Sequence, residues 1–300
     1  MNPLNYLRDP FGFGRSRLSS QPSYKNREDL ANKVFLITGA SKGIGEALVT
    51  GLTNKPVELI TVSRTEMDSS GRRTHLSVNL DQPESLPELC QLDVLVDGIV
   101  FNAGAMPNTA PAIHSTLGLD HLYILHVLGP AWIARQLIRS SRLQKGCRII
   151  TVSSGGALPT PLNPDYMGVL KKPYNPIQQY AFHKRYQIEL MSYFSEIYAE
   201  LGYDFYSMHP GWVDTEGLET GMPFFHKLTK GILRVPRQGA DTIEWLLCSE
   251  RQAPGSLYFD RKEVSSYPLF WIKENPEAQR IFRATLESQL SQMDSLLDTN

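Results

Sequence analysis

Short apolar runs alternate with amphipathic, helix-like stretches along most of the chain. The apolar runs predict strands at residues 33–38, 57–62, 74–79, 94–102, 147–153 and 204–208, with a further one at 256–259. Helical patterns cover residues 44–52, roughly 115–140 and 176–201, and Asn175-Pro176 is a typical helix start. Strands that alternate with helices in this way predict a parallel sheet covered by helices on both faces. We therefore expect an α/β fold, a single doubly wound domain with a sheet of about seven strands.

Two terminal segments fall outside this alternation. Residues 1–32 mix Pro, Gly, Ser and Arg and predict a loosely ordered, mildly basic arm; contact with a membrane surface or a partner subunit is the alternative. From about Pro276, apolar residues at spacings of three and four share one helix face: Phe282, Leu286, Leu290, Met293 and Leu297. We expect this face to pack on the main domain, with a partner or a lipid surface as the alternative. The predicted organisation is an arm at 1–32, a main domain at 33–262 and a C-terminal extension at 263–300.

Composition narrows the classes of function. The 300 residues are 41% hydrophobic and 20% charged with a net charge of −1, so nothing indicates the basic surface typical of nucleic-acid binding. Cys90, Cys147 and Cys248 are scattered, and the seven histidines show no clustering typical of a metal site. No apolar run reaches the roughly 18 residues of a transmembrane helix. We expect a cytoplasmic protein without a metal, with peripheral membrane contact and homo-oligomerisation left open.

A glycine-rich turn separates the first predicted strand from the first predicted helix. Its sequence is T-G-A-S-K-G-I-G at 38–45, with the glycine spacing G-x-x-x-G-x-G. Glycines let the backbone approach a pyrophosphate closely, and the helix N-terminus presents free N–H groups to that anion. The pattern predicts the nucleotide site of a Rossmann-type domain, and a turn without a ligand is the alternative. The expected contacts are Gly39, Ser41, Lys42, Gly43, Ile44 and Gly45.

The end of the second predicted strand bears on which nicotinamide cofactor is bound. An acidic residue there would hydrogen-bond the ribose 2′-hydroxyl of NAD and repel a 2′-phosphate. This chain has Ser63 and Arg64 instead, with Lys42 in the glycine loop. Two cations without an acid near the expected 2′ position favour NADP(H) over NAD(H).

Several motifs in a fixed order give the chain a resemblance to a known family. They are T-G-A-S-K-G-I-G at 38–45, F-N-A-G at 101–104, V-S-S-G-G at 152–156, Y-A-F-H-K at 180–184 and H-P-G-W-V-D-T at 209–215. Over about residues 33–260 the chain resembles the short-chain dehydrogenases/reductases, and within them the retinol-dehydrogenase-like branch. The resemblance implies an NADP(H)-dependent oxidoreductase that interconverts a carbonyl and an alcohol by hydride transfer.

The resemblance also implies roles for individual residues. It implies that Asn102, Ala103 and Gly104 contact the adenine-ribose side of the cofactor and also brace the sheet. Asn79 and Leu80 would lie near the adenine. The residues near the nicotinamide would be Pro210, Gly211, Val213 and Thr215. Asn79 departs from the family pattern, which usually has Asp there. His126 stands where the family usually has an Asn that helps to hold a water chain to the catalytic lysine. We interpret His126 as a core histidine with satisfied hydrogen bonds; proton shuttling is the alternative.

Ser154, Tyr180 and Lys184 are the predicted catalytic residues. A phenol with a pKa of about 10 is a poor base near neutrality, and a nearby ammonium lowers that pKa. Tyr180 and Lys184 are four residues apart in a predicted helix, so their side chains share one face. Tyr180 would exchange the proton, Lys184 would lower its pKa and bind the nicotinamide ribose, and Ser154 would hydrogen-bond the carbonyl oxygen. Tyr258 and Lys262 share the spacing, but on a predicted strand end, where the two side chains would not converge.

Two segments are candidates for shaping a substrate pocket. Residues 155–174 are rich in proline and carry Leu158, Leu162, Tyr166, Met167 and Leu170. Residues 216–235, a predicted substrate flap, carry Met222, Phe224, Phe225, Leu228, Ile232 and Leu233. Loops at the carboxyl ends of parallel strands bind ligands in such folds, and an apolar lining suits a lipophilic carbonyl or alcohol of the retinoid, steroid or fatty-aldehyde type. The alternative is that these side chains pack the segments themselves.

Two other functions compete with this interpretation. A non-catalytic module that binds NADP(H) to sense redox state would use His126, the basic arm and the amphipathic tail toward a partner. A methyltransferase would use the glycine loop but has no role for the serine, the tyrosine and the lysine.

Overall fold

A single sheet runs through the protein. The computed structural model describes residues 12–14, 23–106 and 109–298. Within them the sheet has eight strands in the order β3-β2-β1-β4-β5-β6-β7-β8. The strands are β1 (Val34–Thr38), β2 (Glu58–Ser63), β3 (Arg73–Ser77), β4 (Val96–Phe101), β5 (Leu143–Val152), β6 (Asp204–Met208), β7 (Leu257–Phe259) and β8 (Lys262–Val264). Neighbours from β3 to β7 are parallel, whereas β8 pairs with β7 antiparallel.

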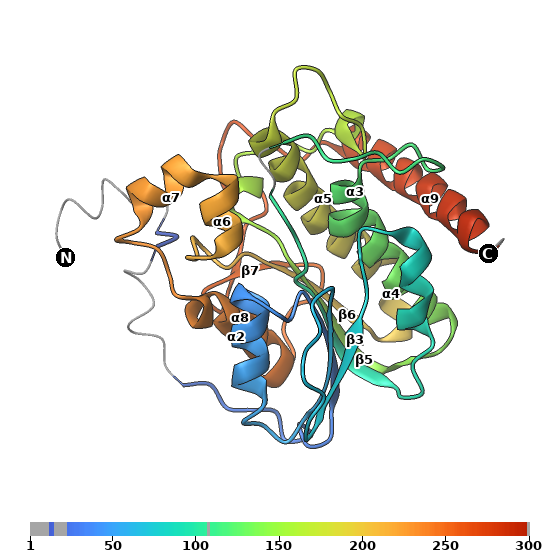
Figure 1. Ribbon diagram of the computed structural model, residues 1–300, viewed down its shortest axis with the longest axis vertical. Coiled ribbons are helices and arrows are strands. Elements are labelled where there is room, and N and C mark those ends of the chain that lie inside the picture. Colours follow the sequence, from blue (N-terminus) through green and yellow to red (C-terminus); the bar gives the residue numbers. More distant parts are fainter. Residues whose placement is uncertain (1–11, 15–22, 107–108, 299–300) are drawn as a thin grey trace.

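Helices cover both faces of this sheet, so the predicted α/β class and doubly wound architecture are confirmed. The longer helices are α2 (Gly43–Leu52), α4 (Gly129–Arg139), α5 (Pro176–Ile197), α8 (Pro236–Cys248) and α9 (Pro276–Asp298). The shorter helical segments are η2 (Pro83–Cys90), α3 (His121–Tyr123), η3 (Ile124–Leu128), η4 (Gly155–Ala157), η5 (Pro164–Tyr166), η6 (Ala199–Leu201), α6 (Glu216–Gly221) and α7 (Pro223–Thr229). Figure 1 shows α2 and α8 on one side of the sheet and α4, α5 and α9 on the other. No helix among the described residues is long and apolar enough to cross a bilayer.

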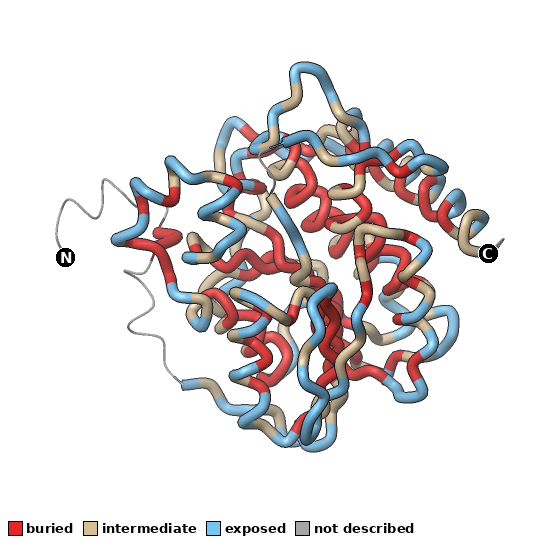
Figure 2. The backbone as a smooth tube through the Cα atoms, viewed as in Figure 1, coloured by how far each residue is buried: buried red, intermediate tan, exposed pale blue. Residues whose placement is uncertain are grey.

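The alternating strand residues build two hydrophobic cores. Phe35 and Ile37 of β1 pack with the α2 and α8 side, whereas Leu36 between them packs with the α4 and α5 side. This follows from the strand period of two, which sends successive side chains to opposite faces. Figure 2 shows buried residues running through the sheet and along the helix faces toward it. The carboxyl ends of the parallel strands therefore lie on a rigid frame.

The helix predicted from about residue 115 begins later, at His121. Asp120 caps it, because its carboxylate accepts a hydrogen bond of 2.7 Å from the Tyr123 N–H, so the residues before it form a turn. The next segment, η3, is a π-helical turn in which the Gly129 N–H donates to the Ile124 carbonyl. Pro130 follows directly and has no N–H to donate to the carbonyl four residues before it, that of His126.

The C-terminal helix α9 packs on the main domain, as its apolar stripe predicts. Four residues of that stripe are fully buried: Phe282, Leu286, Leu290 and Met293. Asp294 anchors the helix further, because its carboxylate accepts hydrogen bonds from Trp132 Nε1 at 2.8 Å and Arg135 Nη2 at 2.6 Å. The alternative of a face left open to a partner or a lipid surface is therefore wrong for this stripe.

Part of the N-terminal arm is also packed. Residues 1–11 and 15–22 of the predicted arm lie outside the described residues. Phe13 is buried, and the Tyr24 hydroxyl donates a hydrogen bond of 2.8 Å to Glu244 Oε1 of α8. For these described residues the predicted loose arm is wrong, because aromatic side chains tie them to the domain.

Candidate active site

The glycine loop joins β1 to α2, as its sequence predicts. Gly39 has a φ of +65°, and a Cβ there would lie 2.7 Å from Ala103 Cα. A Cβ at Gly45 would lie 2.1 Å from the Gly39 carbonyl oxygen, so neither position accepts a side chain. No described side chain caps the N-terminus of α2, which leaves its first N–H groups to an anion. The loop is a cradle that fits a pyrophosphate.

Asn102 fixes this cradle to the centre of the sheet. Its Nδ2 donates to the carbonyl oxygens of Thr38 and Gly39 at 3.1 Å and 3.0 Å. The backbone N–H groups of Asn102 and Ala103 both donate to Thr38 Oγ1 at 3.1 Å. These bonds tie the end of β1 to the end of β4, so the bracing that the resemblance implies is present. A Cβ on Gly104 would lie 3.7 Å from Lys184 Nζ, so the same segment also reaches Lys184.

The cations near the expected 2′ position have acidic neighbours. Lys42 Nζ lies 2.8 Å from Glu216 Oε2, and Arg64 Nη1 lies 3.9 Å from Asp81 Oδ2. The expectation that no acid lies near these cations is therefore wrong, because the fold brings Glu216 of α6 and Asp81, before η2, to them. Lys42, Glu216 and Arg64 are largely exposed, and exposed ion pairs contribute little free energy. An incoming phosphate can therefore replace the carboxylates.

Asn79 offers an unused acceptor after β3. Its Oδ1 is buried and has no hydrogen-bond partner within the part of the chain that the structure describes. Buried polar atoms are normally paired, so an orphaned amide oxygen fits a ligand that donates a hydrogen bond, such as an adenine amine. Leu80 beside it is buried.

The segment after β6 lies against the start of α2. Thr215 Cγ2 lies 3.3 Å from the position of a Cβ on Gly43. Val213 and Ile44 both lie against Gly239 of α8, where a Cβ would be 2.7 Å from Val213 Cγ2. The structure therefore brings the 210–215 segment next to the glycine loop, although the two are far apart in sequence.

Tyr180 and Lys184 project from α5, and Ser154 follows the end of β5. The Ser154 hydroxyl lies close enough to Tyr180 to favour its phenolate form. Lys184 Nζ lies 5.4 Å from the centre of the Tyr180 ring. Tyr258 and Lys262 differ, because Tyr258 pairs with Glu263 across the β7–β8 hairpin and Lys262 pairs with Phe259, which sends the two side chains to opposite faces. Of the two pairs with this spacing, only the first converges.

The pKa of Tyr180 differs from the expected one. Burial raises the pKa of Tyr180 to about 12, although Ser154 acts in the lowering direction. Burial also lowers the pKa of Lys184 to about 7. Burial is the largest influence on the pKa of Tyr180 and Lys184 is not among the groups that shift it, so the expected lowering by Lys184 is not seen in this structure. At neutral pH the phenol keeps its proton.

His126 belongs to a buried group of polar side chains beside Tyr180. The Ala105 N–H donates to His126 Nε2 at 3.1 Å, so the proton of a neutral imidazole is on Nδ1, 3.2 Å from His183 Nδ1. His183 Nε2 lies 3.7 Å from Oδ2 of the buried Asp120. Burial and the neighbouring Lys184 lower the pKa of both imidazoles. Both ring nitrogens of His126 have partners, as the core interpretation predicts.

The two segments proposed to shape a substrate pocket are only partly open. Leu158, Leu162 and Met167 are buried, and so are Ile232 and Leu233. Leu158 packs with Ile188 and Leu257, and Leu162 and Met167 belong to the core on the α4 and α5 side of the sheet, so these three side chains are part of the hydrophobic core. Phe224 and Leu228 on α7 are 81% and 60% exposed.

Phe13 is a site neighbour that no sequence pattern singled out. A Cβ on Gly155, next to Ser154, would lie 2.8 Å from Cε2 of the Phe13 ring. The ring also meets Trp212 edge-on, with centroids 5.9 Å apart. Gln187 was missed as well, although its Oε1 accepts a hydrogen bond of 3.1 Å from Lys184 Nζ. The sequence does contain a signal for Gln187, because a glutamine three residues after Lys184 lies on the same helix face.

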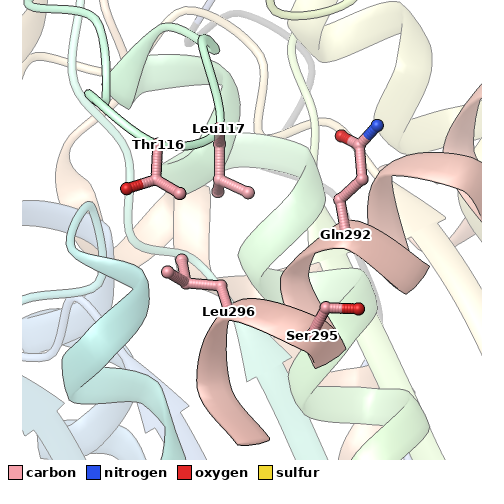
Figure 3. A pocket seen from close by; sticks show the side chains of 5 residues that line it. All are labelled: Thr116, Leu117, Gln292, Ser295 and Leu296. Atoms are coloured by element: carbon pink, nitrogen blue, oxygen red, sulfur yellow. The ribbon is translucent and has the colours of Figure 1, made fainter. Parts of the chain in front are cut away.

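A surface cavity lies away from these residues. It has a volume of about 490 Å³, and its walls come from the turn before α3 and from α9 (Figure 3). The lining residues are Thr116, Leu117, Gln292, Ser295 and Leu296. None of the predicted site residues is among them, so this cavity is separate from the candidate active site.

The chain is similar to known proteins over most of its length. Residues 33–168 match the family described as short chain dehydrogenase. The human protein named Dehydrogenase/reductase SDR family member 12 is 30% identical over 286 residues, which are 88% of this chain and 87% of that protein. The stretches S-M-H-P-G-W at 207–212 and D-R-K-x-V-S at 260–265 predict the likeness to this relative, and it is confirmed.

Two solved structures share the fold. The crystal structure of 3-ketoacyl-(acyl-carrier-protein) reductase from Brucella melitensis, complexed with NADH, has a TM-score of 0.59 at 20% identity and covers 76% of this chain and 96% of that one. A putative NAD(P)-dependent gluconate 5-dehydrogenase from Beutenbergia cavernae, with bound NADP, has a TM-score of 0.58 at 19% identity and covers 73% and 90%. At these identities the likeness is one of fold.

Proposed function

Because the chain belongs to the short-chain dehydrogenase/reductase family, a family of NAD(P)(H)-dependent oxidoreductases, we propose that it reduces lipophilic carbonyl compounds with NADPH and catalyses the reverse oxidation. The observation that carries the proposal is the convergence of Ser154, Tyr180 and Lys184 at the carboxyl end of β5, on the same sheet edge as the glycine cradle. Paired hydroxyls beside an ammonium suit acid–base chemistry on a carbonyl oxygen.

Different residues of the cradle and its surroundings would hold different groups of the dinucleotide. The α2 N-terminus and the glycines at 39, 43 and 45 would hold the pyrophosphate, with Ser41 and Ile44 in the same turn. Asn79 would accept a hydrogen bond from the adenine. Lys42 and Arg64, both exposed, would contact a 2′-phosphate. Charge-assisted hydrogen bonds to the phosphate would then replace their ion pairs with Glu216 and Asp81, which supports NADP(H) over NAD(H).

The three catalytic residues divide the work on the substrate. The bound nicotinamide supplies or accepts the hydride. Ser154 donates a hydrogen bond that holds the substrate oxygen, and Tyr180 passes its proton to that oxygen. The raised pKa of Tyr180 keeps the phenol protonated at neutral pH, which suits reduction. Lys184 then stabilises the phenolate that remains.

The flap supports a lipophilic substrate. Phe224 and Leu228 are exposed on α7, and Phe225 meets Trp212 edge-on with centroids 5.1 Å apart. Trp212 belongs to the 210–215 segment next to the glycine loop. We place the substrate flap at residues 216–235 on this ground, with retinoids, steroids or fatty aldehydes as the substrate class.

Two of the three features that favoured the binding-only alternative are accounted for, and the third, the basic arm, lies mostly outside the described residues. The apolar stripe of α9 is buried, and both ring nitrogens of His126 are partnered within the domain. No specific observation among the described residues favours a redox-sensing module.

The test uses the full chain with NADPH and a panel of decanal, all-trans-retinal and androstenedione. We expect loss of reduced-nicotinamide absorbance with at least one carbonyl. Tyr180→Phe should lower kcat by roughly 10²–10⁴-fold without changing the Kd for NADPH, because it removes only the proton donor. Tyr258→Phe is the matched control, since its hydroxyl bonds the Ala253 carbonyl outside the site, and it should keep wild-type turnover. Undiminished turnover in Tyr180→Phe, or NADPH binding without reduction of any carbonyl, overturns the proposal.

A further inference from the structure

The Lys184 ammonium is held by two oxygen acceptors. Its Nζ donates 2.8 Å to the Val152 carbonyl at the end of β5, and 3.1 Å to Gln187 Oε1, one helical turn further along α5. All three groups are buried. A buried ammonium is costly unless acceptors replace its lost water, so both bonds fix where the charge can lie.

Gln187 is itself anchored at its other end. Its Nε2 donates a hydrogen bond of 2.8 Å to the His126 carbonyl in η3. In an α-helix that carbonyl would accept from the residue four positions on, but that residue is Pro130, which has no N–H. The missing donor leaves the His126 carbonyl accessible to a side chain, and the Gln187 amide uses it.

The chemistry at the two ends allows the amide one orientation. An ammonium only donates hydrogen bonds and a backbone carbonyl only accepts them, so Oε1 must face Lys184 and Nε2 must face His126. The amide therefore connects η3 to the catalytic lysine as a bridge of fixed polarity. A side chain that lacks either the acceptor or the donor cannot make both contacts.

We propose that Gln187 is a positioning residue that holds the Lys184 ammonium beside Tyr180 and favours its charged form. The inference rests on the function proposed above, because it gives Lys184 its role. Gln187 does not touch the reacting atoms and acts through Lys184 alone.

The surroundings of Lys184 make its charge sensitive to this bridge. The groups that face it are Tyr180 and His183 from α5 and His126 from η3. Burial lowers the pKa of Lys184 to about 7, so the charged and neutral forms are close in free energy. An acceptor at Gln187 favours the ammonium, its loss disfavours it, and a carboxylate there favours it more strongly.

The direct test is the pKa of Lys184, measured from the ¹³Cε signal of labelled lysine in the full chain without added cofactor. The signal is assigned by its loss in Lys184→Met. Gln187→Leu should lower the pKa of Lys184 by about one pH unit, the size expected for one hydrogen bond to a charged group. Gln187→Glu should raise it. If Gln187→Leu does not fold, the test rests on whether the pKa of Lys184 rises in Gln187→Glu.

Gln289→Leu is the matched control. Gln289 is also a buried glutamine that bridges two elements, accepting from the Tyr123 hydroxyl at 2.7 Å and donating to the Met167 carbonyl at 3.4 Å. Its loss removes two comparable hydrogen bonds from the fold, and the pKa of Lys184 should stay at the wild-type value. An unchanged Lys184 titration in both Gln187 variants, or the same change in Gln289→Leu, overturns the inference.

Kinetic measurements distinguish this inference from the proposed function. They use NADPH and whichever carbonyl compound the wild type reduces fastest. In Gln187→Leu we expect kcat to fall about tenfold, with its alkaline limb moved to lower pH, while the KM for the carbonyl is kept. Wild-type kcat and pH profile in Gln187→Leu, alongside loss of turnover in Tyr180→Phe, would defeat the positioning role alone. Full turnover in Tyr180→Phe would defeat the proposed function, and the NMR titration would still decide whether Gln187 holds the ammonium.

Discussion

The ring of Phe13 packs against the backbone of Gly155, where a Cβ would lie 2.8 Å from the ring. Gly155 directly follows Ser154, one of the proposed catalytic residues. The Phe13 carbonyl oxygen accepts a hydrogen bond of 2.9 Å from the Trp212 N–H, and Trp212 in turn meets Phe225 of the flap. One residue of the arm therefore supports both the loop after Ser154 and, through Trp212, the proposed substrate flap.

Phe13→Ala should weaken substrate binding more than cofactor binding. Loss of the ring leaves a cavity beside Gly155, and we expect a KM for the carbonyl raised about tenfold, with a loss of roughly 2–4 kcal/mol in unfolding free energy. Steady-state kinetics and urea unfolding measure both effects. Phe270→Ala is the control, since Phe270 is 84% exposed, and equal KM values in the two variants would refute the role of Phe13.

Arg64→Gln should weaken NADPH binding selectively. A charge-assisted contact with a 2′-phosphate contributes about 1.5–3 kcal/mol, which corresponds to roughly 10–100-fold in Kd. The Kd for NADH should not change, because NADH lacks that phosphate. Fluorescence titration with both nucleotides measures the difference, and Arg72→Gln, another exposed arginine paired with an acid, is the control. Equal weakening of NADPH and NADH would place Arg64 elsewhere on the cofactor.

Buried histidines should make the fold sensitive to acid. Burial, and then Arg234, lower the pKa of His209 to about 3, whereas an unfolded histidine titrates near 6.5. The unfolded chain therefore binds a proton that the folded protein does not bind. The contribution of His209 to the free energy of unfolding is complete above about pH 6.5. It falls as the pH drops toward 3, by up to about 1.4 kcal/mol per pH unit. His209→Phe should flatten the plot of unfolding free energy against pH in that window. A slope equal to that of the wild type would show that His209 does not contribute.

The anchoring of α9 predicts a specific loss of stability. Asp294 accepts hydrogen bonds from Trp132, Arg135, Gln136 and Arg139 of α4, so Asp294→Ala removes an acceptor shared by four side chains. We expect a loss of about 2–4 kcal/mol in urea unfolding. Asp298→Ala, at an exposed position of the same helix, should cost little. Unfolding of Asp294→Ala at the wild-type urea concentration would contradict this anchoring.

Local pattern was enough to predict much of the fold. The apolar run at 204–208 coincides with β6, and Asn175-Pro176 marks the start of α5. The short strand β8 was missed, because K-E-V at 262–264 has no apolar run and becomes a strand only by pairing with β7. The start of the long helix was misplaced, because the Asp120 cap depends on the fold rather than on periodicity.

The candidate site, like the fold, was predicted only in part from local sequence. Tyr180 and Lys184 were predicted from helix spacing, which the five residues at 180–184 are enough to show. The partners of the cations, Asp81 and Glu216, come from other elements and had no local signal. The raised pKa of Tyr180 depends on burial by the whole domain, which spacing does not report.

The central claim is that hydride transfer from the cofactor is accompanied by proton donation from Tyr180. Isotopic labelling of the hydride tests this claim most directly. The full chain is incubated with NADPH that carries deuterium at both C4 positions of the nicotinamide and with decanal, all-trans-retinal or androstenedione, and the alcohol product is analysed by mass spectrometry. We expect a single deuterium in the alcohol from the wild type, and product only at the level without protein from Tyr180→Phe. Absence of labelled alcohol with every carbonyl, or labelled alcohol from Tyr180→Phe at the wild-type rate, would contradict the account.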